Sequence, residues 1–397
     1  MKNSAQKIRT SHVGRLPTPA GLEDMPQRLA SGQPISPADM TGRVEPAIAG
    51  IIKRQVELGI DCVGDGEFWA GLGFPYYSQQ MSGLSQRPLN PGEVSSTRES
   101  TRERDEFRAF YGDMDRVGTL FCIPGEKPIP QARQRMIASA PIKTKGIETT
   151  QRQLATFKAA IARAGVPVEE AFVPALAPGW LDHFVYNEHY KTEEEFVYAL
   201  ADALSDKYHA IADAGFILQL DDPGIVTSWD MLKPEPSAAA YRKYAKLRIE
   251  ALNHALAGIP EEQVRYHFCW GSWHGPHTND IPLSEILDIA LSVKAQCYSF
   301  EAGNARHEHE WIVWKDVKLP AGKILMPGVV SHATNIVEHP ELVAQRITTF
   351  ANVVGRENVI AGTDCGLGNR LHPELVWAKL AALGAGAAIA SKSLWRK

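Results

Sequence analysis

The stretch YHFCWG at residues 266–271 decides how the rest of the chain is interpreted. Residues 264–265 before it begin a short buried strand, and the glycine at its end stops that strand. Side chains alternate along a strand, so His267 and Cys269 point to the same side. Such a pair can bind a metal ion if further ligands converge on it, although alone it is more often a pair of ordinary core residues.

Seven further strand candidates surround this stretch, and most are followed by a segment with helical periodicity. The strands begin near residues 8, 60, 171, 216, 297, 323 and 357, and helices are predicted at 37–58, 149–164, 193–214, 238–257, 283–295, 339–353 and the C-terminus. Eight such units favour an α/β fold with a parallel sheet closed into a (β/α)8 TIM barrel, as a single domain over residues 1–397. A doubly wound open sheet is the alternative. Its dinucleotide-binding form is disfavoured, because no Gly-x-Gly-x-x-Gly motif follows the first strand.

An inserted segment at about residues 70–135 follows the second predicted strand. It is the least regular part of the chain, with clusters of Gly, Ser and Pro. The charge run at 97–106 within it predicts a solvated helix face or loop rather than a binding patch. Whether the insertion forms a lid or an interface stays open.

The composition excludes several classes of protein. The 397 residues are 44% hydrophobic and 22% charged, with a net charge of −4, so nothing indicates a nucleic acid partner. The N-terminus lacks the apolar run of a signal peptide, and no stretch approaches the roughly 20 consecutive apolar residues that cross a membrane. The five cysteines are odd in number and far apart, which favours the reducing cytoplasm. Whether the chain forms a homo-oligomer stays open.

Polar residues follow strand after strand of the predicted barrel at its carboxyl end. Those ends share one face of a barrel, and active sites gather there. Random placement would not prefer one end of each strand. The residues are His12, Arg15, Asp65, Glu67, Asp221, Asp222, His267, Cys269, Glu301, Ser331, His332, Asp364 and Cys365.

Four of these side chains can form a tetrahedral zinc site, namely His267, Cys269, Glu301 and Cys365. The alternative makes Cys365 a small core residue and Glu301 an ion-paired acid. The other cysteines suit the core, and the remaining nearby histidines suit supporting or substrate contacts; they are Cys62, Cys122, Cys297, His274, His277, His307 and His309.

The ligand types constrain the reaction. Two thiolates neutralise Zn²⁺, which makes the ion a poor activator of water. Such an ion still binds an incoming thiol and holds it as a nucleophilic thiolate at neutral pH. The residues alone therefore favour alkylation of a thiol over hydrolysis.

Motifs along nearly the whole chain resemble the catalytic domain of cobalamin-independent methionine synthase. Two stretches, at 270–277 and 306–311, are similar to a short single-barrel branch that includes epoxyalkane–coenzyme M transferases. The motifs of the main resemblance are HVGRLP at 12–17, DGE at 65–67, QLDDP at 219–223, HFC at 267–269, SFE at 299–301, GVV at 328–330 and TDCGLG at 363–368.

The resemblance implies zinc at His267, Cys269, Glu301 and Cys365, and it implies roles for other residues. It places the thiol substrate against Val13, Gly14, Arg15, Glu67 and Asp221. His332 falls near a proton-donating histidine of the family, and an acid near Asp221 or Asp222 is the alternative donor. Arg15 stands where methionine synthases have a serine, which suggests a different anionic tail. Trp180 either stacks on a flat donor or belongs to the core or a lid.

Three functions are compatible with these residues. The first is zinc-dependent methyl transfer to homocysteine or a related small thiol. The second is addition of a thiol to an epoxide, as in 2-hydroxypropyl-coenzyme M formation. The third is a barrel decarboxylase or a non-catalytic relative without zinc.

Overall fold

The computed structural model describes residues 1–30, 33, 35–69, 74–117, 134–368 and 370–396. Within these residues, parallel strands form an eight-stranded sheet in the order β1-β11-β10-β9-β8-β7-β5-β2. All eight predicted strands are confirmed. They are β1 (Arg9–Thr10), β2 (Cys62–Gly64), β5 (Glu170–Leu176), β7 (Ile217–Asp221), β8 (Val264–Phe268), β9 (Cys297–Phe300), β10 (Ile324–Val330) and β11 (Ile360–Thr363).

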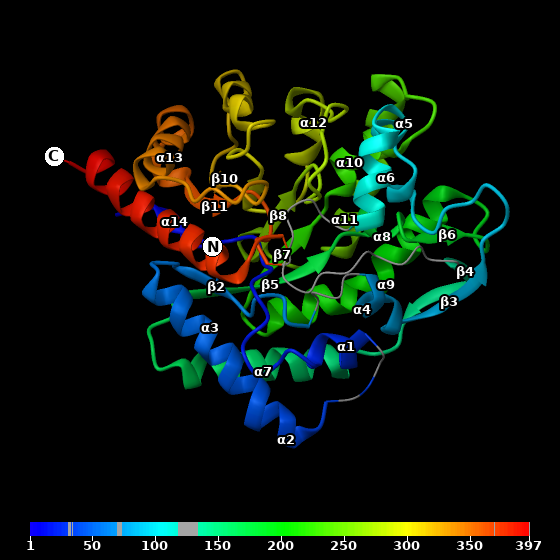
Figure 1. The fold of residues 1–397 in the computed structure, drawn as a ribbon, viewed down its shortest axis with the longest axis horizontal. Coiled ribbons are helices and arrows are strands. Elements are labelled where there is room, and N and C mark those ends of the chain that lie inside the picture. The colour runs from blue at the N-terminus through cyan, green and yellow to red at the C-terminus, as the bar shows by residue number, and fades with distance from the viewer. Residues whose placement is uncertain (31–32, 34, 70–73, 118–133, 369, 397) are drawn as a thin grey trace.

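Hydrogen bonds between the first two strands nearly close the sheet into a barrel. The Asp61 amide donates to the Thr10 carbonyl at 3.1 Å, and the Ser11 hydroxyl donates to the Cys62 carbonyl at 2.9 Å. The chain order of the strands runs around this barrel, with helices outside it (Figure 1). The predicted TIM-barrel fold is confirmed, and the open sheet is excluded.

Helices follow the strands where the helical periodicity predicts them. Glycines with positive φ end two of these segments, Gly59 at +82° and Gly215 at +84°, since glycine adopts this conformation without steric cost. The outer helices include α3 (Glu45–Glu57), α7 (Glu148–Ala164), α9 (Glu193–Asp213), α11 (Ala238–Ala255), α12 (Leu283–Ala290), α13 (Pro340–Val354) and α14 (Pro373–Leu394).

The inserted segment is more regular than its sequence indicates. Strand β3 (Met81–Pro88) pairs antiparallel with β4 (Gln134–Thr144), and β4 pairs with β6 (Val185–Asn187) in a separate three-stranded sheet. Between β3 and β4 lie α5 (Arg102–Glu106) and α6 (Arg108–Val117), which stand beside α10 (Gly224–Met231) in Figure 1. Residues 70–73 and 118–133 of the insertion lie outside the described residues.

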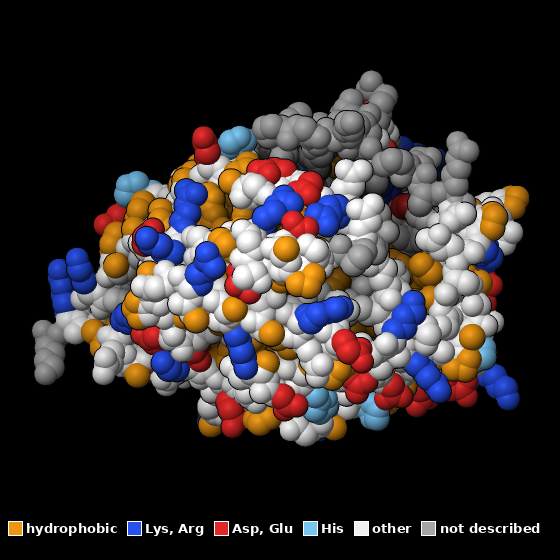
Figure 2. Space-filling model, turned by 90° about the horizontal axis from the view of Figure 1, so that it is seen from below, with side chains coloured by type: hydrophobic (Ala, Val, Ile, Leu, Met, Phe, Trp, Pro, Cys, Tyr) orange, Lys and Arg blue, Asp and Glu red, His pale blue; other side chains and the backbone are white. Residues whose placement is uncertain are grey.

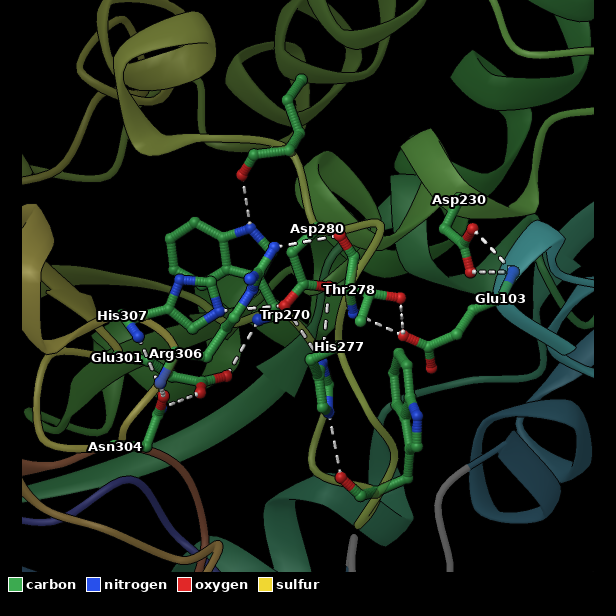
Figure 3. A network of polar contacts seen from close by, with 12 residues as sticks. Glu103, Asp230, Trp270, His277, Thr278, Asp280, Glu301, Asn304, Arg306 and His307 are labelled. Atoms are coloured by element: carbon green, nitrogen blue, oxygen red, sulfur yellow. Dashed lines mark hydrogen bonds and ion pairs between the residues drawn. The ribbon is translucent and has the colours of Figure 1, made fainter. Parts of the chain in front are cut away.

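The prediction that the charge run is solvated is wrong at Glu103, whose exposed fraction is 2%. Its carboxylate accepts hydrogen bonds from the Tyr111 hydroxyl and from the Thr278 amide in the loop after β8. Its own amide donates to Asp230 of α10 (Figure 3). These hydrogen bonds join the insertion to the loop after β8 and to α10, and those that the Glu103 carboxylate accepts compensate its burial.

One described helix, α14, is long and apolar enough to cross a membrane by length and composition. Half of its apolar window is buried, and α14 packs on α13 and on strands β10 and β11. It therefore serves as an outer helix of the barrel. On the face shown in Figure 2, positive and negative side chains are interspersed, as the near balance of charge leads one to expect.

Candidate metal centre

His267 lies in β8 with its ring held from one side. Ser299 of β9 contacts Nδ1 at 3.1 Å, and the side chain is 1% exposed. The other ring nitrogen, Nε2, is buried without a hydrogen-bond partner among the described residues. A buried imidazole nitrogen left free while its opposite nitrogen is fixed is the arrangement of a metal ligand.

Two free cysteines complete a cluster with His267. The Sγ atoms of Cys269 and Cys365 lie 3.8 Å apart, and the ligand atoms of all three residues lie within 4.8 Å of one another. A hydrogen bond from the Cys269 thiol lowers the pKa of Cys365 well below its ordinary value. Residues from β8 and from the end of β11 thus meet at one place, as the strand-end pattern predicts.

Glu301 lies beside this cluster and is held by two donors. The Trp270 amide donates to Oε1 at 2.9 Å, and Asn304 Nδ2 donates to Oε2 at 2.6 Å (Figure 3). A carboxylate oxygen of Glu301, a ring nitrogen of His332 and a carboxylate oxygen of Asp364 lie within 4.8 Å of one another. The structure therefore brings three of the four predicted ligands together and places the fourth in an adjoining group.

Asp364 fixes the loop that carries Glu301. Its Oδ1 accepts from the amides of Ala302 and Gly303, each at 2.8 Å. Burial raises the pKa of Asp364 to about 6. Burial also lowers the pKa of His332 to about 3, so this imidazole is neutral at pH 7.

Gly14, Arg15 and Glu67, three of the residues predicted to contact the thiol, lie close together. Gly14 has φ +100°, and a Cβ there would lie 1.9 Å from Glu67 Oε1, so only glycine fits. The Arg15 Nε lies 3.7 Å from Glu67 Oε2. Burial raises the pKa of Glu67 to about 7, and the charge of Arg15 opposes that rise. Val13 is buried beside them, and its amide donates to Thr363.

The two adjacent aspartates at the end of β7, Asp221 in the strand and Asp222 just after it, face different ways. Asp221 accepts from Gln219 Nε2 at 2.7 Å, and burial raises its pKa well above the ordinary value, with Glu67 adding to the rise. Asp222 accepts instead from the Tyr266 hydroxyl at 2.9 Å. Because Tyr266 and His267 alternate along β8, Asp222 is not brought to the cluster.

Trp180 in α8 (Pro178–Leu181) is nearly buried, with an exposed fraction of 9%. Its ring contacts His183 and Phe184, and the guanidinium of Arg98 lies 5.6 Å from the ring centroid. Stacking of Trp180 on a substrate stays a prediction.

A layer of paired charges supports the loop after β8. Asp280 contacts both His277 and His307, at 3.1 and 3.0 Å, and His307 also contacts Glu310 (Figure 3). The His307 ring stacks on Trp270 with centroids 3.8 Å apart. His277 and His307 thus make the supporting contacts predicted for them, whereas His309 is exposed.

Sequence reasoning missed Ser299, Asn304 and two arginines. Ser299 stands inside the quoted SFE motif, so its alternation with Glu301 could have indicated an inward position. Asn304 carries no such signal, because its contact with Glu301 depends on the loop. Arg98 and Arg370 lie far apart in sequence, and only the fold brings Arg98 over Trp180 and Arg370 to Ser272 in the loop after β8.

Fold and site together define a class: barrel proteins with a cluster of sulfur and nitrogen ligands at the carboxyl ends of their strands. Residues 183–388, more than half of the chain, match the family model described as the cobalamin-independent synthase catalytic domain. The chain belongs to this family.

Relatives and solved structures agree with this membership. A methionine synthase of Saccharolobus islandicus is 22% identical over 391 residues, covering 98% of this chain and 96% of that protein. A methionine synthase of Thermococcus kodakarensis is 24% identical over 226 residues, which cover 57% of this chain and 59% of that protein. The structure of a B12-independent methionine synthase from Shewanella sp. W3-18-1 with selenomethionine has a TM-score of 0.70 at 18% identity, covering 98% of this chain and 99% of that one.

Proposed function

We propose that this chain is a zinc-dependent methyltransferase that moves a methyl group onto the thiol of homocysteine. The observation that carries the proposal is the cluster of buried His267 and Cys269 with half-buried Cys365, in which two free sulfurs lie 3.8 Å apart. Family membership supports methyl transfer. Relatives named methionine synthase that align over nearly the whole chain support homocysteine as the acceptor and a single functional unit over residues 1–397.

The residues present fit a zinc ion. His267 Nε2 is buried and unpartnered in the described structure, and the two thiols are not joined in a disulfide. His267, Cys269 and Cys365 would hold the ion, with Glu301 as the fourth ligand. Zinc bound there would supply the positive charge that keeps an incoming thiol deprotonated at neutral pH.

The thiol substrate lies against Val13, Gly14 and Arg15 in this proposal. Glu67, whose charge is favoured by Arg15, accepts hydrogen bonds from the substrate amino group. The Glu67 carboxylate packs directly over Gly14, where a Cβ would lie 1.9 Å from Oε1, so glycine keeps the carboxylate in its place for the substrate.

Asp221 is the proton donor to the leaving group. Its Oδ1 already accepts from Gln219, which leaves Oδ2 to carry the proton, and its raised pKa keeps that proton at neutral pH. His332 suits this role less well, since its imidazole is neutral at pH 7 with a pKa of about 3. Asp222 then supports Tyr266 rather than the substrate.

Epoxide opening by a thiol is the second candidate. Arg15 favours it, because a guanidinium beside Glu67 suits a sulfonate or carboxylate tail on the thiol. Zinc and the thiol would have the same roles, and only the electrophile would differ.

Two paired assays test the proposal. Purified protein is analysed for zinc and then given homocysteine with methyl donors, or coenzyme M with epoxypropane. We expect one zinc per chain and S-methylation of homocysteine. Epoxide opening without methylation would replace the first candidate with the second, and a metal-free active protein would contradict both.

Cys269→Ser tests the cluster itself. We expect loss of zinc and of at least about 99% of the activity, because removal of one thiolate leaves a site too weak to retain the ion. Cys297→Ala is the matched control, since Cys297 is a free buried cysteine packed with Ile324 and Met326, outside the cluster. An active, zinc-free Cys269→Ser protein would disprove the role of the cluster.

A further inference from the structure

Three arginines lie near the candidate metal centre, where the charge of Arg370 acts on both Arg15 and Arg98, and Cys269 acts on Arg98. Arg15 joins the loop after β11 through its carbonyl, which accepts from the Gly368 amide at 2.9 Å. Arg370 lies two residues beyond that glycine, and its Nε donates to Ser272 Oγ at 3.0 Å, in the loop after β8. Arg98 reaches over Trp180 from the insertion.

The insertion fixes Arg98 in this place. The adjacent Thr97 hydroxyl contacts His183 Nδ1 at 2.7 Å, and the Ser96 hydroxyl donates to the His183 carbonyl at 3.1 Å. Glu103 ties the following helix to Thr278 and Asp230. The segment that carries Arg98 is therefore fixed before it by the contacts with His183 and after it by the contacts of Glu103.

The positive charges of these arginines are poorly compensated. Arg98 and Arg370 form no ion pair with a carboxylate among the residues that the structure describes, and the Arg15 contact with Glu67 is long at 3.7 Å. Burial and then the neighbouring Arg370 and Arg104 lower the pKa of Arg98 to about 10. Arg104 differs, because it forms an ion pair with Asp115.

A metal ion would not supply the missing negative charge. Two thiolates neutralise a divalent cation, and Glu301 as a fourth ligand would leave one net negative charge, which is fewer than the three guanidinium charges. Positive charges that lie close together in a partly buried place repel one another, which raises the free energy of the protein. A bound anion would offset this repulsion.

We propose that Arg15, Arg98 and Arg370 form a binding site for an oxyanion group of a substrate, with Arg98 supplied by the insertion. The site takes a carboxylate or a chemically similar sulfonate or phosphate, since a guanidinium pairs with each through parallel N–H donors. This group belongs either to the thiol acceptor or to the alkyl donor. The inference rests on the proposed function only in treating the cluster as the place of reaction.

The test compares two alkylating probes of the same shape at the metal-depleted, full-length chain. Iodoacetate is anionic and iodoacetamide is neutral, and both transfer their CH2 carbon to a thiolate with loss of iodide. The rates of alkylation at Cys365 are measured by mass spectrometry, and their ratio reports how strongly the site attracts an anion. The fraction of Cys365 present as thiolate does not affect this ratio, because both probes react with the same thiolate. Circular dichroism checks that each variant is folded.

We expect Arg98→Gln and Arg370→Gln each to lower the iodoacetate-to-iodoacetamide ratio by about three- to tenfold, as expected for loss of one charge near the thiol. Arg98→Lys should retain most of the ratio, because it keeps the charge. Arg163→Gln on the exposed face of α7 is the matched control and should not change it. Equal ratios in the wild type and both Gln variants would overturn the proposal.

A second arm identifies which substrate carries the anion. If the acceptor does, methionine should lower the wild-type ratio and methioninamide should not. If the donor does, neither should lower it while the arginine variants still do. Neither arm requires zinc or methyl transfer, so a failure of this inference is distinguishable from a failure of the proposed function.

Discussion

At the scale of single residues, the account depends on how the imidazole of His267 is oriented. Ser299 contacts Nδ1, which leaves Nε2 directed to the two sulfurs. Ser299→Ala should weaken zinc binding by about 10- to 100-fold, a typical loss when a partner behind a metal ligand is removed. Competition with a chelator measures this affinity. Ser85→Ala, at an exposed hydroxyl of the insertion, is the control, and an unchanged affinity in Ser299→Ala would contradict the role of Ser299.

Gly14 gives a second prediction at the residue scale. Gly14→Ala should raise the KM for homocysteine at least about tenfold while zinc content stays the same, because the new Cβ displaces Glu67 Oε1 from 1.9 Å away. Gly92→Ala is a matched control: Gly92 also has a positive φ, +83°, but nothing lies within 4 Å of its added Cβ. An equal KM for both variants would show that the contact with Glu67 is irrelevant to the thiol.

Alternation explains which site residues could be predicted from the sequence. His267 and Cys269 share a face because they are two apart, and the same rule separates Asp221 from Asp222. The prediction that an acid near Asp221 or Asp222 donates the proton did not distinguish the two aspartates, because both stand at the end of the same strand. Partners such as Asn304 could not be predicted, because their contacts arise in loops that have no period.

At the scale of elements, the insertion is joined to the barrel through His183. Its ring contacts Thr97 at 2.7 Å and Ser228 at 2.8 Å, and burial lowers its pKa to about 4. The unfolded chain, with a pKa of 6.5, binds this proton more readily between pH 6.5 and 4. The contribution of the neutral ring to stability is therefore present above pH 6.5 and is lost as the pH falls through that window.

His183→Gln should make stability less dependent on pH in this range. The wild type should lose up to about 3 kcal/mol more than the variant between pH 7 and pH 4. Unfolding in denaturant at both pH values measures this difference. His189→Gln, at an exposed histidine of the same region, should behave as the wild type does. Parallel pH curves for the wild type and His183→Gln would contradict the buried neutral ring.

The insertion also shows where prediction from the sequence fails for elements. The barrel strands are apolar runs bounded by glycine and helix, so their pattern survives in the sequence. Strand β3 is half-buried, contains Gly83 at a shift of register and ends in Pro88, which conceals its alternation. Glu103 looks solvated because burial of a charge depends on distant partners.

At the scale of the whole molecule, the barrel brings together residues that lie almost the full chain apart. Gly14 near the start and Cys365 near the end meet because β1 pairs with β11. The ligands on β8 and beyond β11 then face the thiol-binding side across the barrel mouth. The repeated strand and helix pattern predicts this meeting. It does not predict the position of Arg98, which lies in the inserted segment between β3 and β4.

The coordination of zinc tests the central claim most directly. X-ray absorption at the zinc edge of the purified full-length protein should show two sulfur ligands at about 2.3 Å and nitrogen or oxygen ligands at about 2.0 to 2.2 Å. Addition of homocysteine should add a third sulfur. A shell without sulfur, or one that does not change when homocysteine is added, would contradict the claim that this cluster activates a thiol.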